Sequence, residues 1–334
     1  MSTTAQVGTD EGGIRLDRWF KRYYPDITHG AVEKLLRTGQ VRVDGKRAKA
    51  SDRLQVGQAI RIPPQLQGKA AEATEPREPT FNDGDKKLIE KLVIYEDQTV
   101  FVLNKPSGLA TQGGSGITKH MDGMLEALQG KKRQRPRLVH RLDRDTSGVI
   151  LVARTVPAAA TLSEALRHRD ARKIYWALVK GVPRPHKGII KLALAKETGF
   201  GRHGKDERMA PADEDDAHAK SAVTYYAVLG TAADQYAWVA LKPVTGRTHQ
   251  LRAHMAAIGT PIVGDFKYGG PAAKGMGELE DRLHLHAHSI DIAHPEGGRL
   301  RATASLPPHM VQAWRLFGFD AKRAEDPFEE LSAR

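Results

Sequence analysis

The sequence predicts an α+β fold in two domains joined by a linker, and three observations lead to this prediction. Residues 13–64 contain two short amphipathic helices followed by strand-like segments. Residues 65–85 contain few apolar side chains, as linkers do. Residues 86–320 alternate between strand-like and helix-like segments and are numerous enough to bury a second core. The ends of the chain, 1–12 and 321–334, are expected to be a disordered lead and a frayed tail.

The first domain is predicted to begin with two helices. Leu16, Trp19 and Phe20 share one face of the first helix. Thr28 is placed to cap the second helix, which ends near Gly39. A small sheet should follow, in which residues 41–43 and 59–62 are strands and Asp44-Gly45 is a hairpin turn.

Basic side chains are concentrated in this first domain. Residues 14–64 hold 12 Lys and Arg against 5 Asp and Glu, a net +7 out of the +12 of the whole chain. Such a surplus indicates a polyanionic partner, which can be RNA, DNA or an anionic membrane. The longest apolar run, 236–241, is far too short to cross a bilayer, so we expect no membrane partner.

The second domain is predicted from its alternating segments. Residues 198–220 are polar, contain glycine and are dense in charge, which is typical of a surface loop. The strand-like segments are 100–103, 148–153, 175–179 and 222–228, and the helix-like segments are 158–167 and 248–258.

The chain contains no cysteine, which excludes disulfides and thiol catalysis. Residues 1–11 also lack the basic and apolar regions of a secretory signal. Both observations favour a cytoplasmic protein.

The densest group of charges lies in residues 138–152. Five ionisable side chains occupy residues 140–145 and interrupt two apolar strands. A carboxylate such as Asp143, beside arginines at the rim of a core, is held in place by them. The alternative is a solvated turn in which residues 145–147 bond their own backbone. The residues alone leave both interpretations open.

A second stretch, 245–254, combines a turn with a helix. Thr248 can cap the helix that follows. His249 and Arg252 then lie on one face, from which Arg252 can reach another segment. The alternative is an amphipathic surface helix with ordinary charges.

A third stretch, 173–181, is predicted to be a strand. Alternation places Lys173, Tyr175 and Ala177 on one of its faces. A tyrosine at such a position is more often a core or interface residue than a catalytic one.

The basic first domain resembles an S4-type RNA-binding module. The resemblance is carried by residues 15–19 (RLDRW) and 35–46 (LLRTGQVRVDGK), and it covers nearly the whole domain. It implies contacts with RNA from the basic side chains of these stretches, and the alternative is a small helical domain with a solvated basic face. The side chains expected to bind RNA are Arg15, Arg18, Arg37, Arg42 and Lys46.

The second domain is similar to the RluA-type family of pseudouridine synthases. The resemblance runs from about residue 92 to 307, and its most specific mark is HRLD followed by TSG within residues 140–148. Residues 104–109 (NKPSGL) match as well. Residues 113–116 (GGSG) and the S4-like module point to the RluC-like enzymes of the large ribosomal subunit. The resemblance implies a mixed, mostly antiparallel sheet with a central basic cleft, no cofactor and no metal. It also implies 23S ribosomal RNA as the partner, and we expect a monomer.

The same resemblance implies roles for single residues. Asp143 is the essential carboxylate, and Arg252 is its ion-pair partner. Tyr175 stacks on the target base and helps to remove the C5 proton, and Arg141 fills the gap left by the flipped uridine. Asp143 either attacks C1′ of the ribose or removes the 2′ proton to give a glycal, and the sequence leaves both routes open. Further RNA contacts are expected from two basic side chains of the same motifs, Arg247 and His140.

Other kinds of site fit the residues less well. His284, His286 and His288 alternate on one strand face, but no Cys or carboxylate in that run completes a zinc set. A half-exposed strand edge near RNA is the expected alternative. Residues 113–117 (GGSGI) fail the G-x-S-x-G pattern of serine hydrolases, and no phosphate-binding loop motif is present.

A non-catalytic RNA-binding or ribosome-assembly protein is the alternative from another functional class. Such a protein also needs basic domains. It does not need the set of Asp143, Tyr175 and Arg252, so the presence of that set favours the enzyme.

Overall fold

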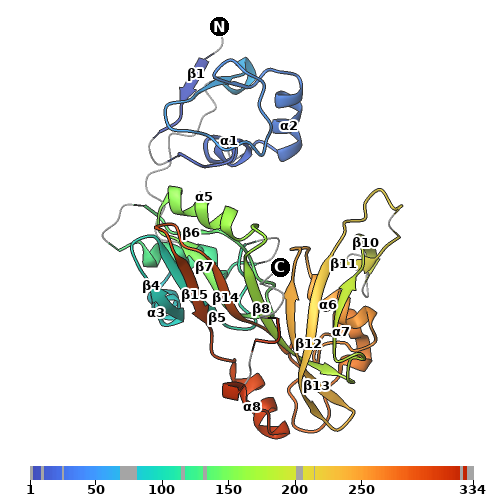
Figure 1. Cartoon of the computed structure of the whole chain (residues 1–334). Coiled ribbons are helices and arrows are strands. Elements are labelled where there is room, and N and C mark those ends of the chain that lie inside the picture. The colour runs from blue at the N-terminus through green and yellow to red at the C-terminus, as the bar shows by residue number, and fades with distance from the viewer. Residues whose placement is uncertain are drawn as a thin grey trace. The chain divides into compact units, whose positions relative to one another are not determined.

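The computed structural model describes most of the chain and divides into two compact units, Met1–Thr80 and Phe81–Arg334 (Figure 1). Among the described residues, no helix combines the length and the apolar character needed to cross a bilayer. The described residues are 3–8, 11–24, 26–67, 81–113, 117–130, 134–200, 206–213, 215–323 and 326–328.

The first unit packs two helices against a three-stranded sheet. The helix α1 (Leu16–Tyr23) buries the predicted apolar face. The helix α2 (His29–Arg37) begins after Thr28, whose Oγ1 accepts a hydrogen bond from Ala31 N at 3.3 Å, so the predicted cap is confirmed. The sheet has the order β1-β3-β2. Its strands are β1 (Thr3–Gln6), β2 (Arg42–Val43) and β3 (Ala59–Ile62), and the 3₁₀ turn η1 (Pro64–Leu66) follows.

The hairpin turn predicted at Asp44-Gly45 is also present. Both residues are left-handed, with φ of 49° and 74°. A two-residue hairpin needs this conformation because its twist matches that of the flanking strands.

The predicted disordered lead is wrong for the part of it that the structure describes. The strand β1 pairs antiparallel with β3, and Val7 beyond it is buried in the core of the unit. Gly8 N and the hydroxyl of Tyr23 both donate to the buried carboxylate of Glu11. A short polar segment shows no alternation in sequence, and it becomes a strand only because the edge of β3 offers it a hydrogen-bonding partner.

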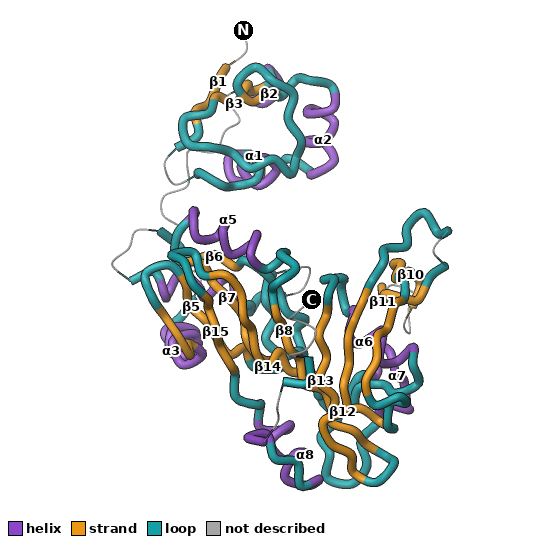
Figure 2. Tube along the Cα trace, viewed as in Figure 1, coloured by secondary structure: helices purple, strands orange, loops and turns teal. Residues whose placement is uncertain are grey.

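The second unit is built on a ten-stranded sheet with the order β4-β5-β7-β14-β8-β13-β12-β9, to which β15 adds on β14 and β6 on β7 (Figure 2). Among the described strand pairs only β7 and β14 run parallel. The predicted mixed, mostly antiparallel sheet is therefore confirmed, and the central cleft stays a prediction. The strands are β4 (Val93–Glu96), β5 (Val100–Lys105), β6 (Arg137–Leu138), β7 (Ser147–Ala153), β8 (Arg172–Lys180), β9 (Lys187–Lys191), β12 (Val223–Ala232), β13 (Tyr236–Pro243), β14 (Leu285–Ala293) and β15 (Arg299–Thr303).

Side-chain alternation along β7 assigns each residue to one of two cores. Val149 and Leu151 pack with α5 (Val156–Ala165) on one face of the sheet. Ile150 and Val152 pack on the other face with α3 (Asp83–Leu92), α4 (Met121–Met124) and the 3₁₀ turn η2 (Leu125–Leu128). A strand covered on both faces reads as a continuous apolar run, which is why this strand was predictable.

The strands β8 and β13 are likewise covered on both faces. Trp176 and Trp238 pack with α8 (Pro308–Phe317), whereas Ala177 and Val239 pack with α6 (Gln250–Ala257). Tyr175 packs against the apolar clusters of α4 and of α6, so it lies where the two halves of that face meet. The remaining helical segments are α7 (Phe266–Gly269), η3 (Gly270–Ala273) and η4 (Ala321–Arg323).

The predicted linker contains the start of a helix. The helix α3 begins at Asp83, within the predicted range 65–85, because Asn82 and Asp85 form a capping box. The polar composition that suggested a linker also suits the first turn of a helix, where carboxylates are favourable. Residues 68–80 of the predicted linker lie outside the described residues.

The predicted surface loop 198–220 contains parts of a hairpin. The strands β10 (Leu194–Phe200) and β11 (Asp206–Pro211) pair antiparallel, and residues 201–205 and 214 lie outside the described part. Charged side chains on both strands hid the alternation. Arg208 Nε donates to Glu197 Oε2 across the pair, which shows how these charges are used.

The tail is not frayed over the residues that the structure describes in it. Phe328 is buried with the cluster of α8, and Asp326 forms an ion pair with Arg172 of β8. One aromatic residue in a charged segment has no sequence pattern. Its burial depends on apolar side chains of β8, β13 and α8, against which it packs.

His286 and His288 of β14, and His284 directly before this strand, do not lie on a half-exposed strand edge, so that prediction is wrong. The strand β14 is inside the sheet, between β7 and β8, and His284 and His286 are fully buried. Burial lowers the pKa of each to about 4, and the pKa of His288, stacked on Trp176, to about 3. These histidines are therefore neutral core residues at neutral pH. In the described part of the chain no group of three or more potential ligands could hold a metal ion.

We expect the second unit to lose stability as the pH falls from 7 to 5. The native state keeps His284 and His286 neutral, whereas the unfolded chain protonates them near their ordinary pKa of about 6.5. The unfolded state therefore binds more protons between about pH 6.5 and about pH 4. As the pH falls through this window, each of the two histidines lowers the free energy of unfolding by up to about 1.4 kcal/mol per pH unit. Thermal unfolding in a pH series measures the effect.

A control separates these histidines from the others. His186 is exposed, so His186→Gln should leave the pH dependence of the midpoint unchanged. A midpoint that is constant between pH 7 and pH 5 in the parent protein would contradict the assignment of buried neutral histidines.

Candidate active site

The loop between β6 and β7 carries Asp143, and hydrogen bonds hold its backbone on both sides of this residue. Leu142 is buried, and the hydroxyl of Thr111 donates to Leu142 O at 2.6 Å. Thr146 N donates to Asp143 O at 3.2 Å and closes the turn. The backbone of Asp143 is thus held, while its side chain remains 22% exposed.

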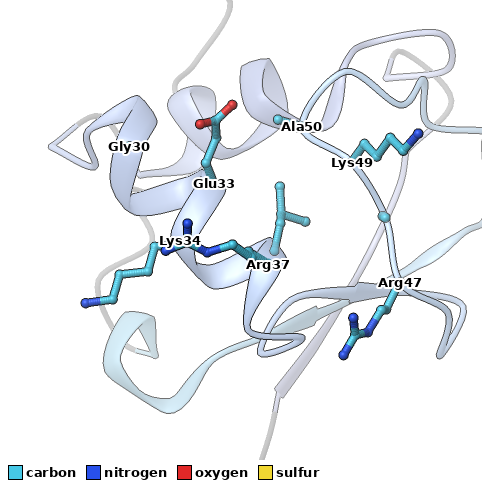
Figure 3. A pocket seen from close by; sticks show the side chains of 9 residues that line it. Gly30, Glu33, Lys34, Arg37, Arg47, Lys49 and Ala50 are labelled. Carbon is cyan, nitrogen blue, oxygen red and sulfur yellow. The ribbon is translucent and has the colours of Figure 1, made fainter.

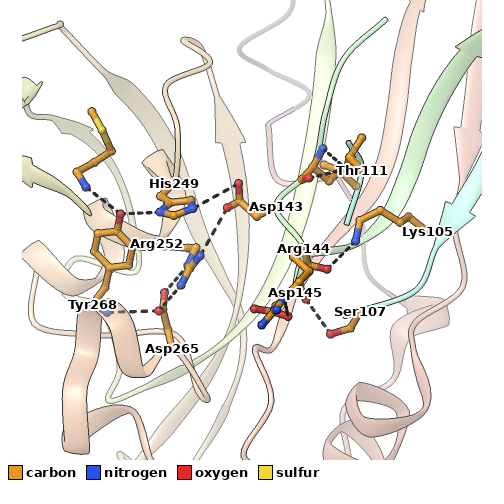
Figure 4. Close-up of polar contacts among 12 residues, drawn as sticks. Lys105, Ser107, Thr111, Asp143, Arg144, Asp145, His249, Arg252, Asp265 and Tyr268 are labelled. Atoms are coloured by element: carbon orange, nitrogen blue, oxygen red, sulfur yellow. Dashed lines mark hydrogen bonds and ion pairs between the residues drawn. The ribbon is translucent and has the colours of Figure 1, made fainter. Parts of the chain in front are cut away.

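Lys105 anchors the same loop from the side away from Arg252 (Figure 4). Its side chain is fully buried, and its Nζ donates to Leu109 O at 2.7 Å, Arg144 O at 2.8 Å and Pro106 O at 3.0 Å. Burial lowers the pKa of Lys105 to about 7, against the attraction of Asp145 and Asp143. Three carbonyl oxygens around three N–H groups nevertheless match an ammonium ion, and on this geometry we treat Lys105 as charged.

The glycine of the TSG motif is required by a close approach of two strands. Gly148 has φ of 111°, and a Cβ at this position would lie 2.2 Å from Ala287 O of β14. A larger residue would separate β7 from β14, which are the parallel pair of the sheet. The motif glycine therefore maintains the strand that follows the Asp143 loop.

Arg252 reaches the site from α6, on the opposite side of Asp143 from Lys105 (Figure 4). Its Nη1 lies 3.7 Å from Asp143 Oδ2. A shorter contact joins it to Asp265, with Nε–Oδ2 at 2.8 Å and Nη2–Oδ1 at 2.7 Å. Asp265 is only 1% exposed, so the guanidinium is held bidentately by a buried carboxylate and presents its remaining nitrogen to Asp143.

The backbone places Asp265 through a second essential glycine. Gly264 has φ of 78°, and a Cβ there would meet Arg282 O at 1.9 Å. Asp265 then begins α7 and accepts a hydrogen bond from Tyr268 N. The same carboxylate thus caps a helix and orients Arg252.

His249 faces Asp143 from the start of α6. Its Nε2 lies 3.7 Å from Asp143 Oδ1, and its Nδ1 lies 2.8 Å from the hydroxyl of Tyr268. The predicted cap at Thr248 is wrong, because His249 occupies the N-cap position in a left-handed conformation with φ of 52°. Both oxygens of Asp143 therefore have a nitrogen neighbour at the same distance.

Tyr175 lies on β8, close enough to Asp143 for the charge of that carboxylate to act on it. Burial raises the pKa of its hydroxyl, and the negative charge of Asp143 raises it further. Tyr175 is therefore a neutral phenol at neutral pH, able to stack and to donate a hydrogen bond. Removal of a proton from substrate by this group would require its own proton to be passed on.

Of the side chains predicted to contact RNA in the second unit, one is exposed and two form hydrogen bonds with the backbone. Arg141 is exposed beside Asp143. Arg247 Nε donates to Ser221 O at 3.1 Å. His140 Nε2 accepts a hydrogen bond from Leu151 N at 2.9 Å, and burial lowers the pKa of this imidazole to about 4. The ring of His140 therefore supports β7, which leaves its Nε2 engaged by the backbone.

The first unit offers a second candidate site, a cavity of about 570 Å³ between α2 and residues 47–50 (Figure 3). Four cations surround it and one carboxylate, Glu33, lies at its edge. The sequence indicated Arg37 but missed the other three, because only the folded chain brings residues 47–50 back beside α2. The four cations are Lys34, Arg37, Arg47 and Lys49.

The other residues predicted to bind RNA in this unit differ in availability. Arg15 Nη2 pairs with Asp17 Oδ2 at 2.6 Å. Arg42 Nη1 donates to Gly45 O at 3.0 Å and supports the hairpin turn. Two further basic side chains are exposed, and these are Arg18 and Lys46.

Sequence reasoning missed four residues of the Asp143 site. Lys105 was visible only as part of a family resemblance, and His249 only as a helix position. Asp265 and Tyr268 belong to a stretch without charge clustering or periodicity. A glycine directly before an aspartate at 264–265 is the one local signal, and its meaning depends on the approach of residue 282.

Comparisons with known proteins show the family to which the chain belongs. The family model described as RNA pseudouridylate synthase matches residues 99–257, and the S4 domain model matches residues 14–60. The mitochondrial RNA pseudouridine synthase 4 of Arabidopsis thaliana is 38% identical over 94% of this chain and 81% of that protein. The ribosomal large subunit pseudouridine synthase C of Rickettsia bellii is 34% identical over 88% of this chain and 95% of its own.

A solved structure agrees as well. The human RNA pseudouridylate synthase domain containing 4 superposes with a TM-score of 0.57 and 29% identity, covering 70% of this chain and 95% of that one. The chain therefore belongs to the RluA-type family of RNA pseudouridine synthases, isomerases that convert uridine into pseudouridine.

Proposed function

We propose that this chain isomerises uridines of 23S ribosomal RNA, with Asp143 as its catalytic carboxylate. The observation that carries the proposal is the environment of Asp143. Its backbone is fastened by buried groups, while its carboxylate is partly open to solvent and has Arg252 Nη1 and His249 Nε2 at 3.7 Å. The ribosomal substrate is inferred from relatives that are named for the large subunit.

The reaction breaks the bond between C1′ and N1 of uridine and forms one between C1′ and C5. The C5 proton is lost and N1 gains a proton, so the atoms balance without a cofactor. Asp143 takes part either as nucleophile at C1′ or as base at C2′, and both routes need a carboxylate beside the ribose. The target must leave its helix first, at a cost of a few kcal/mol. The proposed occupant of the gap is Arg141, whose side chain is exposed.

Mapping tests the whole proposal. Pseudouridine positions in ribosomal RNA should be compared between cells with and without the gene, and between cells that carry the parent protein or Asp143→Asn. Specific 23S positions should lose the modification in the absence of the protein and regain it only with the parent. If the pseudouridines of 23S RNA were unchanged and pseudouridines in another RNA were lost, the protein would still be a pseudouridine synthase, but 23S RNA would not be its substrate.

We expect Tyr175→Phe and Tyr175→Leu to differ. The phenylalanine ring can still stack, so binding of substrate RNA should stay near normal while turnover slows. Leucine also loses stacking, which contributes ~1–3 kcal/mol per base, so the dissociation constant should rise by about 5- to 150-fold. Filter binding and single-turnover rates measure both effects. Parent-like values for both variants would return Tyr175 to an ordinary core position.

The basic cavity of the first unit is expected to bind the RNA backbone. Replacing Arg37, Arg47 and Lys49 by alanine should weaken binding to a long ribosomal fragment and lower the slope of log affinity against log salt by about 2–3, since each phosphate contact contributes ~0.7–0.9. The rate at saturating substrate should stay within about 2-fold, because the Asp143 site belongs to the other unit.

A matched control removes the same charge elsewhere. Lys86, Lys87 and Lys91 are exposed on α3, and their replacement by alanine should leave the salt slope near the parent value. Equal losses in the two triple variants would mean that net charge, and not the cavity, determines affinity.

We also propose that the protein acts as a monomer in the cytoplasm. Sedimentation should give a mass near 36.7 kDa, and cell fractionation should place the protein with the soluble contents. A dimer mass or an organellar location would reject the respective part.

A further inference from the structure

We propose that His249 and Tyr268 are positioning residues for Asp143. A chain of two hydrogen bonds, which begins at the backbone of the β10–β11 hairpin, orients His249, and His249 acts on Asp143 through an electrostatic contact. The inference rests on the proposed role of Asp143 and adds two residues to it. Neither residue is expected to touch the reacting atoms.

The direction of the chain follows from its first donor. Met209 N, in β11, lies 3.0 Å from the hydroxyl oxygen of Tyr268, and a backbone N–H can only donate. The hydroxyl oxygen accepts this bond, and among the described residues His249 Nδ1, at 2.8 Å, is the acceptor that lies within reach of the hydroxyl hydrogen.

This direction selects one tautomer of His249. Because Nδ1 accepts from Tyr268, the ring hydrogen of the neutral imidazole is on Nε2. Nε2 is the atom that faces Asp143 Oδ1 at 3.7 Å. The chain therefore ends with an N–H directed at the carboxylate.

The distance of 3.7 Å makes the last link electrostatic in this structure. Catalytic hydrogen bonds are often long without substrate and shorten in the reacting complex. A small rotation of the Asp143 side chain, which is partly open to solvent, can close the link without movement of the backbone.

The backbone of His249 supports a positioning role. Its φ of 52° is sparsely populated for residues other than glycine, and such conformations concentrate at functional sites. In this conformation His249 stands outside α6 and approaches one oxygen of Asp143, while Arg252, one turn later, approaches the other. If residue 249 had helical dihedral angles, it would be part of the first turn of α6 instead of preceding it.

The charges around His249 favour its neutral form. Burial lowers the pKa of the imidazole, and Arg252 and Lys267 lower it further, whereas Asp143 and Asp265 oppose them. A neutral donor orients the carboxylate without a second full positive charge beside Arg252. Asp143 therefore stays a better nucleophile or base than it would between Arg252 and a protonated His249.

The root of the hairpin is part of the same arrangement. Met209 and Tyr268 pack against Leu194, Ala222 and Ala253, so the hydroxyl of Tyr268 is fixed from the apolar side as well. Because the ring of Tyr268 is packed in place, its hydroxyl keeps the same two partners, Met209 N and His249 Nδ1. A hydroxyl held in this way can determine which tautomer His249 adopts.

The tautomer is tested directly on the full-length protein. Nitrogen-15 spectra of histidine-labelled protein, with His249 assigned from the signal lost in His249→Gln, should show Nε2–H and an unprotonated Nδ1 at pH 7.5. In Tyr268→Phe that preference should be lost. A parent protein with Nδ1–H would overturn the proposal whatever its activity.

Kinetics test the effect on the reaction. Tyr268→Phe and His249→Ala should each lower the single-turnover rate by about 10- to 100-fold, as expected for a misplaced reacting group, with RNA affinity within about 2-fold. His249→Gln should recover part of the loss, because its amide can donate to Asp143. The double variant should be no slower than His249→Ala alone, since both substitutions break one chain.

Two controls keep the outcomes distinct. Tyr95→Phe removes a hydroxyl that bonds to Asp97 far along the sheet, and it should leave the rate near the parent value. Thermal midpoints show whether each variant is folded. Losses that multiply in the double variant, or an equal loss in Tyr95→Phe, would overturn the proposal. Full activity of Asp143→Asn would instead reject the proposed function and leave the tautomer result standing.

Discussion

Replacement of Asp143 by asparagine is expected to abolish pseudouridine formation while the protein stays folded. The two side chains have nearly the same shape, and position 143 is 22% exposed, so packing should survive. The substitution removes the negative charge that faces Arg252 and His249, and with it the group required by either chemical route. We expect the single-turnover rate to fall by at least about 10³-fold, with RNA affinity within a few-fold.

Tritium release from C5-labelled uridine in a 23S fragment measures this rate. Asp145→Asn is the matched control, because Asp145 lies in the same loop, is 44% exposed and pairs with Arg144 at 3.2 Å. It should turn over within a few-fold of the parent. If the two variants have similar rates, Asp143 is not the catalytic carboxylate.

The second large effect is expected from Asp265→Asn. Asparagine keeps one carbonyl oxygen but places an NH₂ group against the guanidinium of Arg252. Arg252 thereby loses its ion pair with a carboxylate whose side chain is only 1% exposed. An uncompensated buried charge costs about 3–5 kcal/mol. The thermal midpoint should therefore fall by roughly 10 °C. Activity should also fall, because Arg252 is no longer held toward Asp143.

Calorimetry and tritium release measure the two losses. The control is Asp234→Asn, since Asp234 is 90% exposed and its ion pair with Arg184, at 3.6 Å, is a surface pair that contributes little. Its midpoint should match the parent within about 1 °C. If Asp265→Asn unfolds at the parent temperature, the bidentate pair does not hold Arg252, and the orientation of Arg252 must come from elsewhere.

The sequence predicted much of the fold because several signals act between near neighbours. The bond from Ala31 N to Thr28 Oγ1 spans three residues, and the left-handed turn at Asp44-Gly45 spans two. The apolar run of β7 needed no knowledge of its partners, because burial on both faces demands such residues in any arrangement.

Predictions failed where a segment takes its structure from a distant partner. The strand β1 exists because β3 has a free edge, and Phe328 is buried because α8 and β8 leave space for it. The run His284, His286 and His288 suggested an edge, whereas the order of the sheet places β14, which carries His286 and His288, between β7 and β8. A period of two shows which residues share a face but not whether that face is covered.

The candidate site divides in the same way. The sequence by itself determined that charged residues at 140–145 interrupt two apolar strands, and the motif around Asp143 indicated the family. Only the tertiary structure decided that Arg252 is held by Asp265 and that His249 faces Asp143 from a left-handed backbone. The physical reason is that an ion pair depends on distance in space, and the sheet order places residues far apart in the chain within 4 Å. Local patterns carry no information on which of several carboxylates a buried arginine will meet.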